Sequence, residues 1–208
     1  MSKRRLSLGD YTVGWVCALP IELAAAEEML DETHDRLDNH DLPGVYTLGR
    51  ISGHNVVITC LPKGWMGTNS AAAVATRLQS TFPAMRFGVL VGIGGGVPSA
   101  TADIRLGDVM VSQPERRHGG VVQYDFGKST PSGLERTGYL NSPPTILLEA
   151  VSKLQASHLR GRTRLHDYVA HFTSLPEFAS PAAEEDVLFD PDYTHPGGTT
   201  CADCDLKK

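Results

Sequence analysis

The chain has 208 residues and a mass of 22.4 kDa, with 41% hydrophobic residues, 21% charged residues and a formal net charge of −5. This length suits one domain with a sizeable core, and the apolar fraction excludes a wholly disordered protein. No apolar run reaches the roughly 18 residues of a membrane-spanning helix, and the net acidity argues against nucleic acid as a partner. We therefore expect a protein that binds neither membranes nor nucleic acids.

The charge is unevenly distributed along the chain. Residues 1–160 contain 15 Lys and Arg and 15 Asp and Glu, whereas residues 161–208 contain 4 and 9. The last stretch is also poor in long apolar runs and contains four prolines and the pair Gly197-Gly198. We expect an N-terminal tail (1–10), an α/β domain (11–160), and an acidic peripheral segment of the same domain (161–208), part of it loosely ordered.

The elements of the first half follow from hydrophobic patterns. The basic N-terminus precedes an apolar run, residues 11–19, whose β-branched and aromatic residues predict a buried strand. Because this run meets Pro20 and Glu22 without a small-residue cleavage site, we expect no signal peptide and an intracellular, cytoplasmic protein. Pro20 suits the first turn of a helix over residues 21–30. Residues 45–51 and 55–61 alternate around a short turn and predict a hairpin.

The second half continues the alternation of helices and strands. Residues 68–82 show helical spacing, with Thr68, Asn69 or Ser70 as the cap. Residues 87–91 form an apolar run typical of a central strand covered on both faces. Further strands are predicted at 109–112 and 120–126, and a helix that begins at Pro143-Pro144. Because strands and helices alternate, the fold class is α/β, and the antiparallel hairpin makes the sheet mixed.

The four cysteines are too few and too badly spaced for a disulfide scaffold. Cys17 and Cys60 lie in apolar runs and are expected to be buried thiols. Cys201 and Cys204 form one CxxC motif near His195, but three ligands do not close a structural zinc site. A plain loop without a metal is the favoured interpretation.

A glycine run provides the first candidate site. Gly92, Gly94, Gly95 and Gly96 directly follow a predicted strand, where ligands bind in open α/β sheets. The run matches neither the dinucleotide fingerprint nor the P-loop. It predicts a ligand-facing loop, with a mobile turn as the alternative.

Two further features lie just beyond predicted strands. Glu22 is in the opening turn of the first helix, where stabilisation by the helix dipole alone would explain a carboxylate. Residues 63–69 form a glycine-bearing loop before a helix, which suits an anion or hydroxyl group but also an ordinary capped turn.

In this order, these elements resemble the nucleoside phosphorylase/nucleosidase superfamily, which contains purine and uridine phosphorylases and methylthioadenosine/S-adenosylhomocysteine nucleosidases. The sequence looks closest to the fungal branch found as N-terminal domains of NACHT- or NB-ARC-type immune-receptor-like proteins. The residues that carry the resemblance lie at 13–23, 46–51, 54–57, 67–68, 91–98, 103–109 and 119–128. The fold that the resemblance implies is a three-layer α-β-α arrangement with a central twisted mixed β-sheet.

The resemblance implies cleavage of a ribosyl N-glycosidic bond. The transition state would be oxocarbenium-like, as it is in the hydrolysis of glycosides. Glu22 would hold the attacking water, and Phe126 matches an aromatic residue that reaches into a neighbouring subunit's pocket, which implies a homodimer or larger oligomer. The implied substrate-binding residues are Gly92, Ile93, Gly94, Gly95, Gly96, Gly67, Thr68 and Phe126.

One departure from the family bears on the reaction. Phosphorylases carry an Arg before the glycine loop and a Ser or Thr within it, whereas Leu90 and Ile93 offer phosphate no side-chain donor. Water is therefore favoured over phosphate as the nucleophile, and no cofactor is expected, with inorganic phosphate needed only by a phosphorylase. The resemblance extends to enzymes that remove adenine from ATP, whose phosphates would need cations. The candidates are Lys63, Arg105, Arg116 and Arg117.

A second departure concerns the leaving group. The family's acid is an Asp after a late strand, and a ribose-binding Glu follows Met in a late segment, but neither motif occurs here. Cys204-Asp205 matches only the last two residues of the motif that contains the family's acid, a Cys or Ser followed by Asp. We therefore expect a C-terminally incomplete catalytic domain, without its last strand and helices and inactive as an isolated piece. The alternatives are a phosphorylase, or a non-catalytic module that binds a nucleoside or oligomerises; a Rossmann oxidoreductase is a distant third.

Overall fold

A computed structural model describes residues 4–37, 42–99, 102–116, 118–178, 187, 189–190, 192–198, 201 and 203–205. The strands of the first half are β1 (Val13–Cys17), β2 (Glu32–Thr33), β3 (Thr47–Ile51), β4 (His54–Cys60) and β5 (Phe87–Leu90). The helices are α1 (Pro20–Glu28), α2 (Thr68–Thr81), α3 (Thr145–Leu159) and α4 (Leu165–Ala170). A separate hairpin consists of β6 (Lys128–Thr130) and β7 (Gly133–Glu135), and three short 3-10 helices are η1 (Leu8–Asp10), η2 (His171–Ser174) and η3 (Pro176–Phe178).

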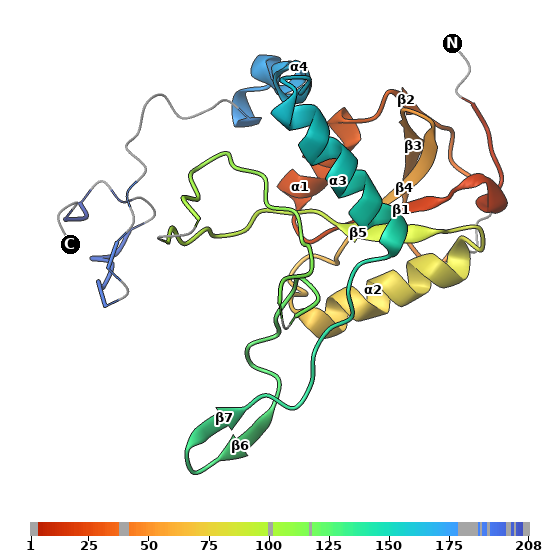
Figure 1. Cartoon of the computed structure of the whole chain (residues 1–208). Coiled ribbons are helices and arrows are strands. Elements are labelled where there is room, and N and C mark those ends of the chain that lie inside the picture. Colours follow the sequence, from red (N-terminus) through yellow and green to blue (C-terminus); the bar gives the residue numbers. More distant parts are fainter. Residues whose placement is uncertain are drawn as a thin grey trace.

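The main sheet has five strands in the order β2-β3-β4-β1-β5 (Figure 1). β1 pairs in parallel with both β4 and β5, whereas β3 pairs antiparallel with β2 and β4. The sheet is therefore mixed, and the predicted α/β class is confirmed.

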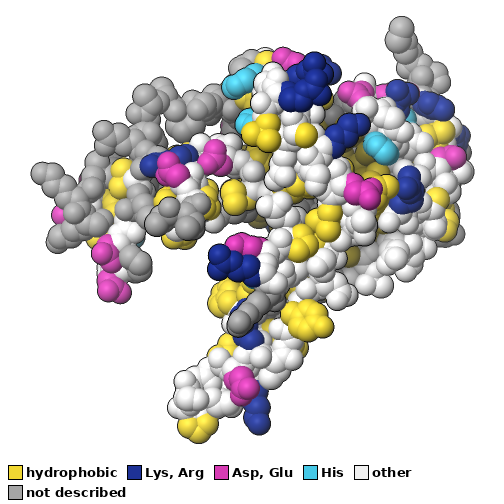
Figure 2. Space-filling view, viewed as in Figure 1, with side chains coloured by type: hydrophobic (Ala, Val, Ile, Leu, Met, Phe, Trp, Pro, Cys, Tyr) yellow, Lys and Arg dark blue, Asp and Glu magenta, His cyan; other side chains and the backbone are white. Residues whose placement is uncertain are grey.

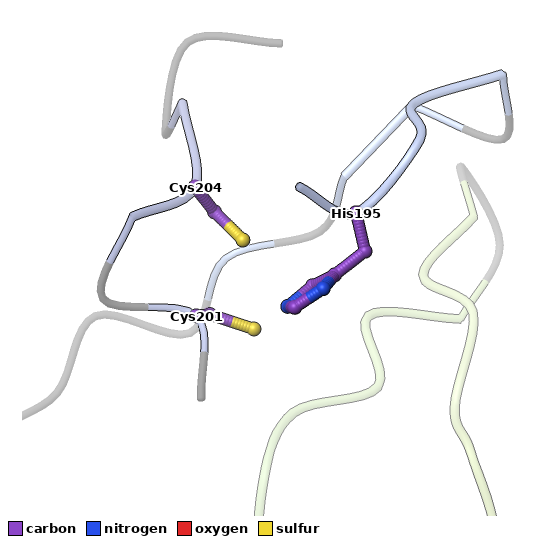
Figure 3. Close-up of side chains that lie close together, drawn as sticks. All are labelled: His195, Cys201 and Cys204. Carbon is purple, nitrogen blue, oxygen red and sulfur yellow. The ribbon is translucent and has the colours of Figure 1, made fainter. Parts of the chain in front are cut away.

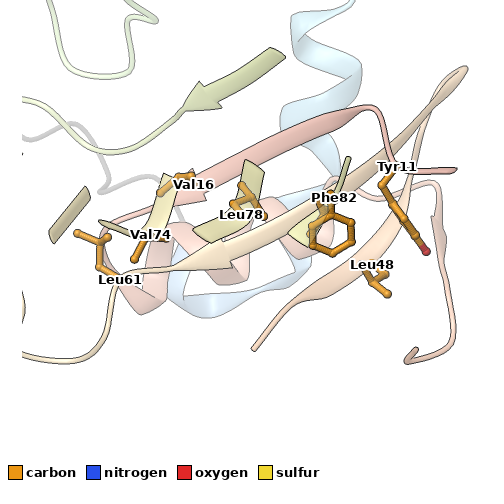
Figure 4. Packing of buried hydrophobic residues seen from close by; sticks show 8 residues of the cluster. Tyr11, Val16, Leu48, Leu61, Val74, Leu78 and Phe82 are labelled. Carbon is orange, nitrogen blue, oxygen red and sulfur yellow. The ribbon is translucent and has the colours of Figure 1, made fainter. Parts of the chain in front are cut away.

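The two faces of the sheet are covered by different helices. Because successive strand residues point to opposite faces, alternate positions of β1 and β4 enter two separate clusters. Val16 packs with Val74 and Leu78 of α2, and Figure 4 shows this cluster continuing to Phe82. Cys17 packs with Ala26 of α1 in the second cluster. Helix, sheet and helix thus form the expected three layers. The remaining members of the first cluster are Tyr11, Leu48, Val57 and Leu61, and those of the second are Val13, Val56 and Ile58.

Local patterns give most of these elements correctly. The predicted first strand, the hairpin and the helices after Pro20 and Pro144 all occur, and α2 spans the predicted range to within one residue. Its cap differs from the prediction, because Gly67, with φ +87°, precedes the helix and Thr68 is already its first residue. Glycine is suited to this left-handed conformation.

Three strand predictions are wrong in position or kind. β5 is the last strand in the sheet order, and Leu90 is 70% exposed, so residues 87–91 are not a central strand covered on both faces. Residues 109–112 and 120–126 form no strand. An extended run becomes a strand only where a neighbouring edge pairs with its N–H and C=O groups, and that pairing is not encoded in the run itself.

The segment with β6 and β7 projects away from the body, and Figure 2 shows hydrophobic side chains on its surface. In the part of the chain that the structure describes, no helix is both long enough and apolar enough to cross a membrane. The division at residues 10 and 160 stays a prediction.

Candidate functional site

Three of the loops singled out in the sequence lie at one edge of the sheet. Because β1, β4 and β5 are parallel, their carboxyl ends point the same way (Figure 1). Glu22 follows β1, residues 63–68 follow β4, and residues 92–96 follow β5. This edge is where open α/β sheets bind ligands.

Glu22 connects two of the loops at this edge, because its carboxylate accepts hydrogen bonds from three backbone N–H groups. Oε2 accepts hydrogen bonds from the N–H of Ala18 at 2.7 Å and of Leu19 at 2.9 Å. Oε1 accepts one from the N–H of Ile93 at 2.8 Å, across 71 positions of sequence. The first two contacts satisfy N–H groups before the first turn of α1, in which Glu22 is the third residue. The third ties the glycine run to that turn.

Gly92 permits this contact by having no side chain. A Cβ atom at position 92 would lie 2.5 Å from Oε1 of Glu22. A Cβ at Gly94 or Gly95 would instead meet nothing within 4 Å. A Cβ at Gly96 would lie 2.5 Å from Cγ2 of Ile104. The glycine run therefore contains two kinds of position: Gly92 and Gly96, where a neighbouring side chain leaves no room for a Cβ, and Gly94 and Gly95, where the backbone is open to a ligand.

The surroundings of Glu22 favour its charged form. Burial of the side chain, which is only 9% exposed, raises the pKa. The hydrogen bonds from Ile93, Leu19 and Ala18 lower it by more, so the pKa of Glu22 lies below its ordinary value of 4.5. Near neutral pH Glu22 is a carboxylate that accepts hydrogen bonds, which suits it to orient a water molecule rather than to store a proton.

The loop after β4 is open to solvent. Lys63, Gly67 and Thr68 are all exposed. Gly64 has φ +84°, and together with the left-handed Gly67 it turns the chain from β4 into α2. The loop shares the edge with Glu22 through strand direction, and it leads into the start of α2, a helix N-terminus whose N–H groups suit an anion or a hydroxyl group.

The remaining predicted residues lie on the stretch after the glycine run. Arg105 forms an ion pair with Asp103, with Nε 2.7 Å from Oδ1. Arg116 is exposed and has φ +45°. Phe126 is 55% exposed, and its ring lies close enough to Gly138 that a Cβ there would be 3.3 Å away. Arg117 lies outside the described residues. None of the three described side chains is brought into hydrogen-bonding contact with Glu22.

Sequence reasoning missed how Ile93 contributes. Ile93 was predicted to bind substrate, but its N–H is donated to Glu22 and its side chain is 73% exposed. The signal for the other two donors was available, because a Glu three residues after the cap is typical of a capping box.

Cys17, buried beneath this edge as predicted, has its pKa raised to about 11, first by burial and then by the nearby Cys60 and Glu22. Cys60 is only half-buried.

A second opening lies beside the edge. An apolar groove of about 450 Å³ runs between α2 and β5 and ends at Leu90, two residues before Gly92. Its lining includes Ala72, Ala75, Leu78 and Val89. The polar side chains in its lining are Gln79 and Arg86, and the rest is apolar, so the groove suits an apolar surface.

Comparison with known proteins agrees with this arrangement. The sequence profile of the phosphorylase superfamily matches residues 12–189. The chain is also similar to a protein of Hyaloscypha variabilis named nucleotide-binding leucine-rich repeat (NLR)-like protein, with 49% identity over 193 residues. The match covers 90% of this chain and 19% of that protein, so the chain spans about a fifth of its relative's length.

Proposed function

Because the chain belongs to the phosphorylase superfamily, we propose that it cleaves the N-glycosidic bond of purine nucleosides or nucleotides, with water as the nucleophile. The observation that carries this proposal is the contact of Glu22 with the N–H of Ile93 at 2.8 Å. It joins the carboxylate after β1 to the glycine run after β5, as the resemblance implied for a water-holding residue beside a ribose pocket.

The chemistry follows from the charge and position of Glu22. As the C1′–N bond breaks, positive charge develops on the ribose, and a nearby carboxylate stabilises it. The same carboxylate accepts a hydrogen bond from the water that forms the new C1′–O bond, and the proton lost by this water balances the one gained by the departing base. The open backbone at Gly94 and Gly95 supplies amide groups for the base and ribose.

Two features support water rather than phosphate. The side chains of Leu90 and Ile93 are apolar and exposed, so neither grips an anion. The N–H of Ile93 is already donated to Glu22, which leaves phosphate one donor fewer and a negative charge beside it. A phosphate dianion would be repelled by this carboxylate unless a cation lay between them.

The substrate and biological setting are further parts of the proposal. For a nucleotide such as ATP, Lys63, Arg105 and Arg116 are the described candidates to face the phosphates, although Arg105 already pairs with Asp103. The 49% identical relative is named an NLR-like protein, and an effector role of this domain within such a protein is part of the proposal. The exposed ring of Phe126 is available to a second copy of the chain, as the implied oligomer requires.

The test is release of free base by the protein expressed from its full reading frame. Adenosine, methylthioadenosine and ATP are each incubated with and without inorganic phosphate, and adenine and the sugar product are separated by chromatography. Free adenine and unphosphorylated C1′ in the absence of phosphate support the proposal. Strict dependence on phosphate would instead assign a phosphorylase.

A non-catalytic module is the second candidate, and one observation favours it. The carboxylate of Glu22 already accepts hydrogen bonds from three backbone N–H groups. Capping of α1 and attachment of the glycine run therefore account for the presence of Glu22 without a catalytic role. In that case no substrate releases base under either condition, while binding of adenosine or self-association is still measured. The same incubation, followed by calorimetry and light scattering, therefore separates the two.

A further inference from the structure

Three metal-binding side chains meet in the segment between residues 189 and 205, away from the sheet. His195, Cys201 and Cys204 each offer one ligand atom, and these atoms all lie within 4.8 Å of one another. Figure 3 shows the imidazole ring and both thiols directed toward a common space. Among the residues that the structure describes, this is the group whose donors have both the chemistry and the proximity to hold a metal ion.

The backbone around these residues is folded so as to bring them together. Gly197 and Gly198 have φ of +111° and +88°, a left-handed pair that turns the chain back after His195. The N–H of Cys204 donates to the carbonyl of Cys201 at 3.1 Å, which closes the turn between the two thiols.

A second set of contacts closes the segment at its base. The N–H of Asp205 donates to the hydroxyl oxygen of Tyr193 at 2.8 Å. The Tyr193 ring stacks on Phe189, with centroids 5.0 Å apart and an interplanar angle of 13°. The contact between Asp205 and Tyr193 therefore joins the two ends of the segment that carries the three ligands, which lowers the entropy that metal binding must overcome.

We propose that His195, Cys201 and Cys204 bind a zinc ion. Two thiolates and an imidazole are ligands that zinc prefers, and a tetrahedral site with bonds of about 2.0–2.3 Å places donor atoms roughly 3.5–3.8 Å apart. The donors, all within 4.8 Å of one another, need to approach by roughly 1 Å at most to reach this geometry. Three protein ligands leave the fourth coordination position to water. The sequence offers too few ligands for a structural zinc site with four protein ligands, but a site with three protein ligands and a water molecule needs no fourth residue.

Charge and protonation are consistent with a divalent cation. Asp203 and Asp205 flank Cys204 and add negative charge to the segment. Zinc replaces the thiol protons of both cysteines, so its affinity rises with pH. The N–H of Gly197 donates to Nδ1 of His195 at 3.1 Å, which places the proton of the neutral ring on Nε2. Coordination through Nε2 therefore requires this contact to be exchanged as the proton moves to Nδ1.

The test uses the full chain, reduced and freed of metal by a chelator. Zinc is titrated against a chromogenic competitor, and cobalt is added in parallel to record thiolate-to-metal absorption. The ligand variants are His195→Gln, Cys201→Ser and Cys204→Ser, and the controls are His158→Gln and Cys60→Ser, which change the same residue types elsewhere. Circular dichroism confirms that all variants retain the fold.

We expect one zinc per chain, thiolate absorption with cobalt, and affinity reduced at least about 100-fold in each ligand variant but not in the controls. Zinc should also protect Cys201 and Cys204, but not Cys60, from alkylation as read by mass spectrometry. The proposal is overturned if the reduced chain binds no zinc, if binding persists in the three ligand variants, or if the two thiols only form a disulfide.

Discussion

An alanine at position 92 would place a methyl group where the carboxylate of Glu22 lies. The added Cβ would be 2.5 Å from Oε1 and 2.8 Å from Cδ of that residue. Because Glu22 is a flexible side chain, it can move aside, but it then loses the hydrogen bond from Ile93 that joins the two loops. We expect Gly92→Ala to separate the glycine run from the turn before α1 and to leave the rest of the fold intact.

The magnitude follows from that one lost contact. A hydrogen bond to a charged group contributes about 1.5–3 kcal/mol to the free energy of unfolding. Alanine in place of glycine returns about 0.4–1 kcal/mol by restricting the unfolded chain. The net loss is therefore about 0.5–2.6 kcal/mol, which lowers the melting temperature of a chain of this size by about 1–10 °C.

Gly94→Ala is the matched control. A Cβ at Gly94 meets nothing within 4 Å, and neither glycine has a positive φ. The control should therefore be neutral or slightly stabilising. Urea unfolding followed by tryptophan fluorescence compares the two variants, and their difference isolates the Ile93 contact. Equal stability of Gly92→Ala and Gly94→Ala would refute the assignment of Gly92 as the position that makes room for Glu22.

Two further predictions test the body of the fold. Burial lowers the pKa of His34 below its ordinary value of 6.5, so acid protonates the unfolded state first and the free energy of unfolding should fall as pH drops below 6.5. His34→Gln should reduce this slope in pH-dependent unfolding, and an unchanged slope would assign it to other groups. Gly14→Ala would place a Cβ 2.8 Å from Sδ of Met85 and 2.9 Å from Cδ2 of Leu78, and overpacking should cost about 1–3 kcal/mol in thermal unfolding. Gly53→Ala, where a Cβ meets nothing within 4 Å, should stay within about 0.5 kcal/mol of the parent, and equal losses in both would contradict the packing of α2 on β1.

The elements that could be predicted are those whose signals are local. The Pro20 start of α1, the spacing of α2 and the alternation of β3 and β4 each depend on neighbouring residues. The place of β5 at the sheet edge depends on which strands pair with it, and the apolar pattern of residues 87–91 does not specify those partners. The same limit explains why the extended runs at 109–112 and 120–126 do not form strands.

The site shows a similar division between local and distant information. Glu22 could be selected because it follows a strand and opens a helix, and its partners Ala18 and Leu19 belong to the same turn. The contact with Ile93 spans two strands and could not be read from spacing. The convergence of His195 on the two cysteines of the CxxC motif likewise depends on how the chain turns between them, which the motif alone does not fix.

The most direct test of the central proposal is the rate of adenine release by Glu22→Gln, compared with the parent protein and with Glu28→Gln. Glutamine keeps the size of Glu22 but loses its charge, while Glu28 is an exposed residue of the same helix. With both variants shown to be folded, we predict a loss of about 10²–10⁴-fold for Glu22→Gln and parental activity for Glu28→Gln. Base release by Glu22→Gln at the parental rate would contradict the account.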